Sequence, residues 1–224
     1  MPAAVWNEIW PVVNEPVLLL LQSSLAAGEL PEEWRHAKIV PLKTPNKADY
    51  WVAKAGRPIY LLSTLGKVFE AVVTERVSYA VETLGLLPTN QFGARKKRFA
   101  EHALLLLQEH TYNARRRSRV LSIVSFDDER AYNEVFKKRL LQRVAARGMP
   151  PDLVRWIDAF CSNRMATILV NGYCSESREL QQAGLAEGSP LSPILFLFFN
   201  VDLVQRNWIR TAAVLYSWTA TRLE

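Results

Sequence analysis

The chain has 224 residues, of which 49% are hydrophobic and 22% are charged. These proportions are ordinary for a folded protein with a sizeable core, and they argue against a largely disordered chain. Lysine and arginine outnumber aspartate and glutamate by 28 to 22, and the excess gathers in residues 91–119, where eight basic residues accompany two acidic ones. Such a cluster favours a polyanion such as nucleic acid, while a solvated helix face explains the charge alone equally well.

Cysteine usage and the N-terminal sequence bear on where the protein resides. The only two cysteines, Cys161 and Cys174, have no CxxC spacing and no nearby histidine. They support neither a disulfide framework nor a zinc site, and they indicate a reducing, intracellular compartment: nucleus, cytoplasm or organelle. No apolar run approaches the ~20 residues of a membrane span. The N-terminus lacks the basic region of a signal peptide, and Glu8 and Glu15 interrupt it, so we expect neither a membrane partner nor secretion.

The predicted elements, in chain order, are long helices with short strands between them. Apolar residues at helical spacing over 5–27 predict a helix that Pro11 and Pro16 interrupt. Ser63 or Thr64 is placed to cap a helix that reaches residue 84. The remaining predicted elements are a strand at 37–42, loops at 43–56 and 85–98, a helix at 99–113, a strand at 120–126, helices at 134–147 and 151–162, strands at 165–170 and 179–181, and a buried helix at 189–206. This mixture without a regular βαβ alternation predicts an α+β fold.

The first candidate for chemistry is the acidic cluster that follows the predicted strand at 120–126. The strand delivers Asp127 at its C-terminal end, and Tyr132 follows five residues later. Phosphoryl transfer needs carboxylates that hold Mg²⁺ against a triphosphate, and a carboxylate at a strand end is rigidly placed for this. An aromatic ring one helical turn beyond it can wall a sugar pocket. Acidic strand-to-helix turns are also common, and Asp128 or Glu134 can equally be a plain helix cap.

The second candidate is the segment 182–193. Two glycines, Gly184 and Gly188, bracket the polar position Glu187, and two Ser-Pro steps beginning at Ser189 lead into a very apolar helix. Glycine allows a backbone to approach a ligand closely, and proline is favourable in the first turn of a helix. A turn followed by a capped core helix is the simpler alternative.

The third candidate is Arg57, which precedes Pro58 and follows a polar loop that begins at Lys43. An arginine before a conformationally locked proline presents its guanidinium in a fixed direction, which suits phosphate oxygens. Taken alone, a surface arginine before a strand explains this motif as well.

In this order the motifs resemble the reverse transcriptases of non-LTR retrotransposons and, more distantly, of group II introns. The resemblance covers residues 30–206, and its further motifs are at 34–43, 57–67, 90–95, 153–157 and 194–199. It implies the fingers and the first part of the palm of a right-hand polymerase, with the thumb absent. The implied division is an N-terminal helical extension at 1–30, a partial reverse transcriptase domain at 31–206 and an atypical tail at 207–224. The implied activity is RNA-directed DNA synthesis, with Mg²⁺ as cofactor and with RNA template, DNA primer and deoxynucleoside triphosphates as partners.

The resemblance also implies roles for single residues. Asp127 matches the first metal-binding catalytic aspartate, and Tyr132 matches the aromatic residue that senses the nucleotide sugar. Arg57, and less closely Lys43, match cations that grip the triphosphate. The loop with Gly184, Glu187, Gly188 and Ser189 matches the element that lines the nucleotide pocket. The basic loop of Arg95, Lys96, Lys97 and Arg98 is expected to contact template phosphates, with little sequence preference and strong salt dependence.

This sequence departs from the family at several positions. Ala186-Glu187 stands where the family has Pro-Gln, and Gly56 stands where an aromatic residue is usual. The family's second acidic motif, an Asp-Asp pair beyond the Gly-Ser-Pro loop, has no counterpart, because the only acids past Phe199 are Asp202 and Glu224. Two-metal chemistry needs carboxylates from more than one strand, so we expect this chain to be inactive alone. The alternatives are a non-catalytic remnant with at most sequence-tolerant nucleic-acid binding, and a helical interaction module, which leaves the motif order unexplained.

Overall fold

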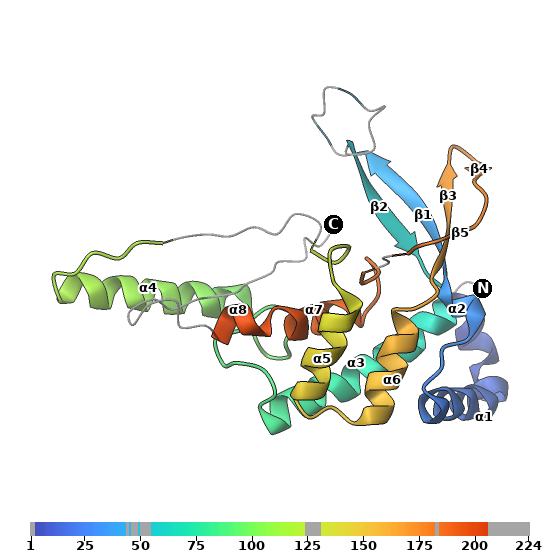
Figure 1. Cartoon of the computed structure of the whole chain (residues 1–224), viewed down its shortest axis with the longest axis horizontal. Helices are drawn as coiled ribbons and strands as arrows, with labels where there is room; N and C mark the ends of the chain where they lie inside the picture. The colour runs from blue at the N-terminus through green and yellow to red at the C-terminus, as the bar shows by residue number, and fades with distance from the viewer. Residues whose placement is uncertain are drawn as a thin grey trace.

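The computed structural model describes residues 3–43, 45, 49, 55–123, 131–181 and 184–205. A helical base carries a small sheet that rises from one end of it, and one helix extends away from the other end (Figure 1). The helices are α1 (Ala3–Ala27), α2 (Glu32–Arg35), α3 (Thr64–Leu84), α4 (Ala100–Arg116), α5 (Lys137–Ala146), α6 (Pro151–Phe160), α7 (Ser192–Phe199) and α8 (Val201–Gln205). Together with the sheet they make an α+β fold, as the sequence predicts.

The sheet is mixed. Its strands are β1 (His36–Lys43), β2 (Gly56–Leu61), β3 (Met165–Val170), β4 (Tyr173–Cys174) and β5 (Arg178–Glu179). The order is β2-β1-β3-β4, and β5 also pairs with β3. The β1–β2 pair is antiparallel, with Val40 opposite Ile59, whereas β1 and β3 run parallel, with Ala37 opposite Ala166. The predicted strand at 37–42 and the strand at 165–170 are confirmed. β5 begins one residue earlier than the predicted strand at 179–181 and ends at Glu179.

The core sits between α3, α5, α6 and α7. Trp156 is fully buried and stacks on Phe160 with 6.2 Å between ring centroids. Phe69 of α3 meets Trp34 edge-on at 4.4 Å. α7 reads Ser-Pro-Ile-Leu-Phe-Leu-Phe-Phe, and its residues 194–198 are all buried because α3 and α5 both contact it. α7, which is apolar on all sides, anchors the glycine loop that precedes it.

α3 follows its sequence signals closely. The Ser63 side chain accepts a hydrogen bond from Gly66 N at 3.4 Å, which caps the helix as predicted. Gly85 ends the helix at φ 63°, the left-handed conformation that favours glycine after a last turn. Its buried stripe includes Phe69, Val73 and Val77, while Val68 is 43% exposed.

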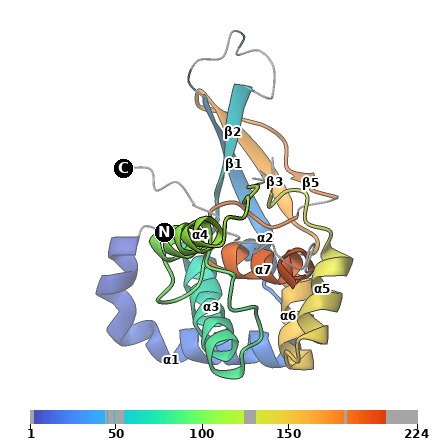
Figure 2. The ribbon, with the colours of Figure 1, turned by 90° about the vertical axis from the view of Figure 1, so that its left-hand side faces the viewer.

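α1 differs from the prediction at its prolines. It is one continuous helix from Ala3 to Ala27 with Pro11 and Pro16 inside it, and Figure 2 shows it bent. Its C-terminal part packs on α6, where Ser24 Oγ accepts a hydrogen bond from Trp156 Nε1 at 3.0 Å. Trp10, Val12 and Leu19 are exposed. Among the described residues α1 alone is long and apolar enough to cross a membrane by length and composition. The search of the sequence for uninterrupted apolar runs did not find this helix, because polar residues interrupt it.

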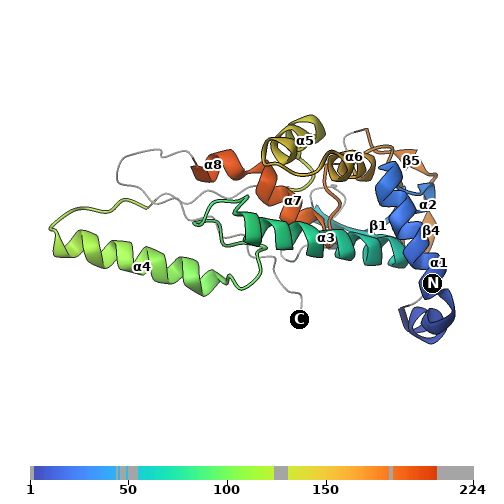
Figure 3. The same ribbon diagram turned by 90° about the horizontal axis from the view of Figure 1, so that it is seen from below.

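α4 stands apart from the base, as the view from below shows (Figure 3). Ala103 is its only buried residue, and Leu104, Leu105 and Tyr112 are exposed. The basic residues Arg115–Arg119 at its C-terminal end are exposed as well. The helix therefore carries a basic tip away from the rest of the molecule.

Two predictions in the second half of the chain need correction. Residues 120–123 form no strand, and Val120 is 94% exposed; the remainder of the predicted strand lies outside the described residues. The predicted helix at 189–206 begins only at Ser192 and is broken at Asn200 into α7 and α8. Most of the predicted loop at 43–56 and all of the tail at 207–224 also lie outside the described residues.

Candidate functional site

The glycine loop before α7 is in direct backbone contact with the segment around Tyr132. Leu185 N donates to Tyr132 O at 2.8 Å, and Val135 N donates to the same carbonyl at 3.3 Å. Gly184 has φ +55°, and a Cβ at this position would lie 2.3 Å from Tyr132 O and 2.7 Å from Asn133 O. Only glycine permits this approach. Two motifs that lie far apart in the sequence therefore share one junction.

The Tyr132 ring points into the core. The residue is 8% exposed, and its ring meets Phe196 of α7 edge-on with centroids 5.4 Å apart. The aromatic pair ties the predicted sugar-sensing residue to the helix that follows the glycine loop. Its role at a nucleotide sugar stays a prediction.

The other end of the loop lies against β2. Gly188 has φ +87°, and a Cβ there would lie 3.2 Å from Tyr60 O. Arg57, an exposed residue, precedes Tyr60 by three positions on the same strand. The structure thus brings the strand of Arg57 to the glycine loop, as the predicted site requires.

Lys43 is placed differently from Arg57. The register sets Arg57 opposite Leu42 and Lys43 opposite Gly56. Because side chains alternate between the two faces of a strand, Arg57 and Lys43 point to opposite faces of the hairpin. The two cations predicted to grip one triphosphate are therefore separated by the sheet.

Two serines fix the back of the loop. Ser189 Oγ donates to Glu70 Oε2 of α3 at 2.5 Å and accepts from Leu191 N at 3.1 Å. Ser192 Oγ donates to Ala186 O at 2.7 Å. Both serines are buried. The Ser-Pro steps therefore act as anchors as well as a helix start.

Behind Ser189 lie two buried charged residues that the sequence analysis missed. Glu70 and Arg164 are each 2% exposed. Burial raises the pKa of the Glu70 carboxyl, against the Ser189 hydrogen bond and the charges of Arg164 and Lys67. Arg164 Nη1 donates to Phe160 O at 2.8 Å, and its guanidinium lies 4.9 Å from the Phe160 ring centroid. The burial of Glu70 could have been predicted from its helical spacing with Val73 and Val77, which puts all three on one face of α3. Nothing in the sequence around Arg164 predicts its burial.

Replacing Glu70 with glutamine is expected to change how stability depends on pH. The folded-state pKa of Glu70 lies above the unfolded value of about 4.3, so proton uptake favours the folded state. The wild-type free energy of unfolding should therefore fall as the pH rises from that value through the raised pKa. Glutamine keeps an oxygen that can accept from Ser189 but does not ionise. Urea titrations at a series of pH values should show the variant gaining stability relative to the wild type across this window. Parallel pH profiles would contradict the prediction.

Glu187 lies in the glycine loop between Gly184, which contacts Tyr132 O, and Gly188, which lies against Tyr60 O. Its carboxylate is half-buried, and Asn133 Nδ2 donates to Oε1 at 3.3 Å. Burial raises the pKa of Glu187, while the positive charge of Arg57 and the Asn133 hydrogen bond act in the opposite direction. Glu187 in turn raises the pKa of Tyr60, although burial of that phenol contributes more. Glu187 is therefore within electrostatic reach of both Arg57 and Tyr60.

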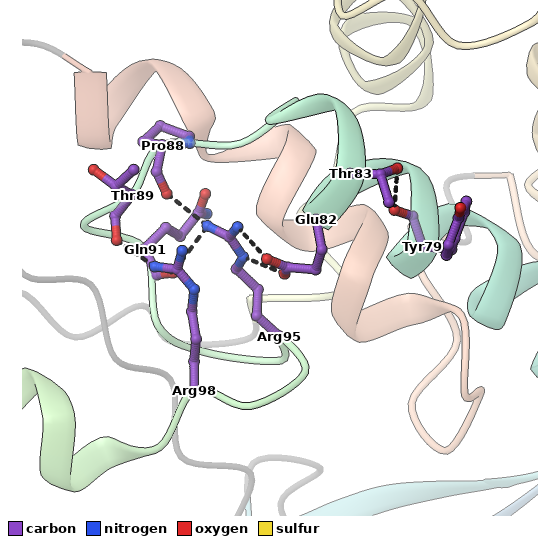
Figure 4. A network of polar contacts seen from close by, with 8 residues as sticks. All are labelled: Tyr79, Glu82, Thr83, Pro88, Thr89, Gln91, Arg95 and Arg98. Atoms are coloured by element: carbon purple, nitrogen blue, oxygen red, sulfur yellow. Dashed lines mark hydrogen bonds and ion pairs between the residues drawn. The ribbon is translucent and has the colours of Figure 1, made fainter.

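Arg95, which the sequence analysis grouped with the template-contacting cations, is an internal residue (Figure 4). Its side chain is 3% exposed and makes two hydrogen bonds of 2.8 Å to the Glu82 carboxylate. Nη1 also donates to Pro88 O at 2.7 Å and to Gln91 O at 3.4 Å. These bonds hold the Glu82 pKa below its usual range. Arg95 therefore fastens the loop to α3, and its donors are already used inside the chain.

The other three basic residues of this loop lie nearer the surface. Lys96 pairs with Glu75. Arg98 donates to Thr89 O, and its guanidinium lies 5.6 Å from the Phe92 ring centroid. Lys97 is exposed at φ 59°, and its side chain forms no hydrogen bond or ion pair with a described residue. Lys97 is thus the residue of the predicted four with its charge most open to an outside partner.

A cavity of about 350 Å³ opens beside the Gly184 junction. Asn133, Lys137, Cys161 and Gly184 are among its lining residues, whereas Arg57 and Gly188 are not. Burial raises the pKa of the Cys161 thiol to about 12, so it stays protonated and is a poor nucleophile. The cavity adjoins the candidate site on the Tyr132 side and does not connect it to β2.

The predicted catalytic residue Asp127 lies outside the described residues, as do Gln182 and Ala183 of the loop. Among the residues that are described, no three His, Cys, Asp or Glu gather as a metal ion would need. The role of Asp127 as a metal ligand therefore stays a prediction.

Comparison with known proteins adds an independent finding. Residues 44–216 match the family model described as reverse transcriptase (RNA-dependent DNA polymerase). The chain is 28% identical over 189 residues to the RNA-directed DNA polymerase from mobile element jockey of Drosophila melanogaster, covering 83% of this chain and 20% of that protein. It is 26% identical over 185 residues to the probable RNA-directed DNA polymerase from transposon BS of the same species, with 83% and 20% covered.

A third relative is the retrovirus-related Pol polyprotein from type-1 retrotransposable element R2 of Popillia japonica. The identity is 27% over 179 residues, covering 79% of this chain and 24% of that protein. The chain thus spans between a fifth and a quarter of the length of these three curated relatives.

Proposed function

Because the chain belongs to the reverse transcriptase (RNA-dependent DNA polymerase) family, we propose that its glycine loop and β2 receive the deoxynucleoside triphosphate used in RNA-templated DNA synthesis. In this proposal the β1–β2 hairpin is part of the fingers, and the loop with α7 is part of the palm. The relatives named above are polymerases of mobile elements, which makes a non-LTR retrotransposon the proposed source of the chain.

The observation that carries the proposal is the convergence of three distant motifs. Gly184 lies against Tyr132 O, Gly188 lies against Tyr60 O, and the exposed residue Arg57 stands three residues before Tyr60 on β2. The loop is fixed by Ser189 and Ser192, so a ligand there would meet a preformed backbone. Preformed sites lose little free energy on ordering when they bind.

The proposed roles follow from the chemistry of these groups. Arg57 presents a planar guanidinium suited to two phosphate oxygens at once. Tyr132 turns its ring to Phe196 in the core and its carbonyl to the glycine loop, so it fixes the loop from below. Ser189 and Glu70 hold the loop in place from behind and are positioning residues.

Reverse transcriptases use divalent metal ions, with Mg²⁺ the proposed cofactor. The described residues do not fit such an ion, because they contain no cluster of three or more metal-ligating acids, histidines or cysteines. We propose that this 224-residue chain does not synthesise DNA by itself, because Asp127 has no acidic pair after Phe199 to share a metal with.

RNA template and DNA primer are proposed as the macromolecular partners. Two exposed groups of cations support this: Lys97 at the end of the basic loop, and the arginines at the tip of α4. Contacts from such residues go mainly to phosphates, so binding should tolerate sequence changes and weaken as salt rises.

Replacing Arg57 with glutamine tests the proposal. The variant should bind dTTP at least about tenfold more weakly than the wild type, because it loses charge-assisted hydrogen bonds to phosphate. Isothermal titration of dTTP into each protein measures the difference. Lys43→Gln is the matched control: it removes the same charge from the opposite face of the hairpin and should change the affinity by less than about twofold. Equal dTTP affinities for the wild type and Arg57→Gln would refute the proposed site.

A further inference from the structure

This chain places a carboxylate at position 187, the polar position of the glycine loop. Asn133 Nδ2 donates to Glu187 Oε1 at 3.3 Å, which ties the carboxylate to the segment after Tyr132. The next residue, Gly188, is pressed against Tyr60 O, so residue 187 cannot swing away from β2 without breaking that contact. The side chain is thus held at the edge of the sheet that carries Arg57.

The charges that face Glu187 come from β2 and from the end of α6. On β2 they are the Arg57 guanidinium and the Tyr60 phenol. The buried Arg164, just beyond α6, acts on Tyr60 and Glu70. The Arg57 charge lowers the pKa of Glu187, against the effect of burial. Arg57 is therefore the cation with which this carboxylate interacts.

We propose that Glu187 is a built-in competitor for the triphosphate: its negative charge, held beside β2, offsets the positive charge of Arg57, weakens nucleotide binding at neutral pH, and is lost when the carboxylate is protonated. This inference rests on the proposed nucleotide site and adds an affinity-determining residue to it. A triphosphate brings negative charge to Arg57, and a fixed carboxylate nearby both neutralises the cation and repels the ligand.

The pH dependence has a definite sign. Burial raises the Glu187 pKa, so protonation begins at a higher pH than for an exposed glutamate. As the pH falls through that range, the competing charge disappears and the affinity for the triphosphate should rise toward that of a protein with a neutral residue at 187. Above the range the charge is complete and the affinity is at its minimum.

The test compares wild type, Glu187→Gln and Glu176→Gln by isothermal titration of dTTP and, separately, of inorganic tripolyphosphate. Glutamine keeps an oxygen for Asn133 but carries no charge. Glu176 is an exposed glutamate beyond β4, at the opposite edge of the sheet from β2, so its replacement makes the same change in net charge away from Arg57.

We expect Glu187→Gln to bind both probes about fivefold more tightly than the wild type near neutral pH, as one charge at this range allows. The ratio should approach one as the pH is lowered through the raised pKa of Glu187. Glu176→Gln should match the wild type. Comparing each variant with the wild type at the same pH cancels the titration of the phosphates themselves.

Two failures are distinguishable. If the wild type and Glu187→Gln bind dTTP equally at every pH while Arg57→Gln loses binding, Glu187 is no competitor and the nucleotide site stands. If neither protein binds dTTP, or if Arg57→Gln binds as well as the wild type, the nucleotide site itself is refuted, and this inference falls with it.

Discussion

Replacing Gly184 with alanine is expected to destabilise the fold by about 4 kcal/mol. A left-handed φ costs a residue with a Cβ about 1–2 kcal/mol. The overlap with Tyr132 O, 2.3 Å from the Cβ position, adds about 3 kcal/mol or more, because forced repacking against rigid atoms is costly. That carbonyl cannot retreat easily, since it accepts from both Leu185 N and Val135 N. The midpoint and slope of a urea titration measure the loss.

Gly172→Ala is the matched control for this prediction. Gly172 also has a left-handed φ, +84°, but a Cβ there would meet nothing within 4 Å. Its replacement should cost only the conformational penalty of about 1–2 kcal/mol. If the two variants lose equal amounts of stability, the close contact between the glycine loop and Tyr132 O does not exist in the folded protein.

Replacing Arg95 with alanine is expected to cost about 3 kcal/mol of stability. The change removes the buried guanidinium and leaves the Glu82 carboxylate and the Pro88 carbonyl without their donors. Because Glu82 is 32% exposed and can recover some hydration, we expect the lower end of the range for a broken buried pair. Thermal or urea unfolding measures the loss, which should shrink as the pH falls and Glu82 is protonated, since the Glu82 pKa is depressed only while Arg95 is present.

Lys97→Ala separates this structural role from nucleic-acid binding. Lys97 is exposed, and its side chain forms no hydrogen bond or ion pair with a described residue, so stability should change by less than about 0.5 kcal/mol. Its affinity for single-stranded RNA should fall, and the slope of log affinity against log salt should decrease by about 0.7. If Arg95→Ala retains full stability and loses only RNA affinity, the internal role of Arg95 is refuted.

Local patterns predicted most of the elements. α3 could be predicted because its signals are local: Ser63 caps its start, an apolar stripe runs along it, and Gly85 ends it. β1 was readable because its β-branched run lies between polar segments. The site was readable in outline, since glycines at 184 and 188 and the Ser-Pro steps are needed for contacts that the structure contains.

The misreadings share a physical cause, which is that tertiary contacts decide the outcome. The sequence predicts Arg95 as one of a run of exposed cations. The turn after α3 instead brings it to Glu82, and this ion pair is not visible in the sequence. Pro11 and Pro16 break helices in isolation, yet α1 continues through both and bends. Glu70 and Arg164 were overlooked because composition alone does not show which charged side chains are buried.

The parallel pairing of β1 with β3 has a consequence for how the molecule is made. His36 of β1 pairs with Met165 of β3, which lies far from it in the sequence. Such remote pairs form slowly, because the long segment between the two strands must be ordered first. On the ribosome β1 and β2 can form their hairpin early, whereas the other edge of β1 stays open until β3 has been synthesised. During that interval the unpaired edge of β1 can form hydrogen bonds with a strand of another nascent chain. Chaperone demand should therefore be highest before β3 emerges.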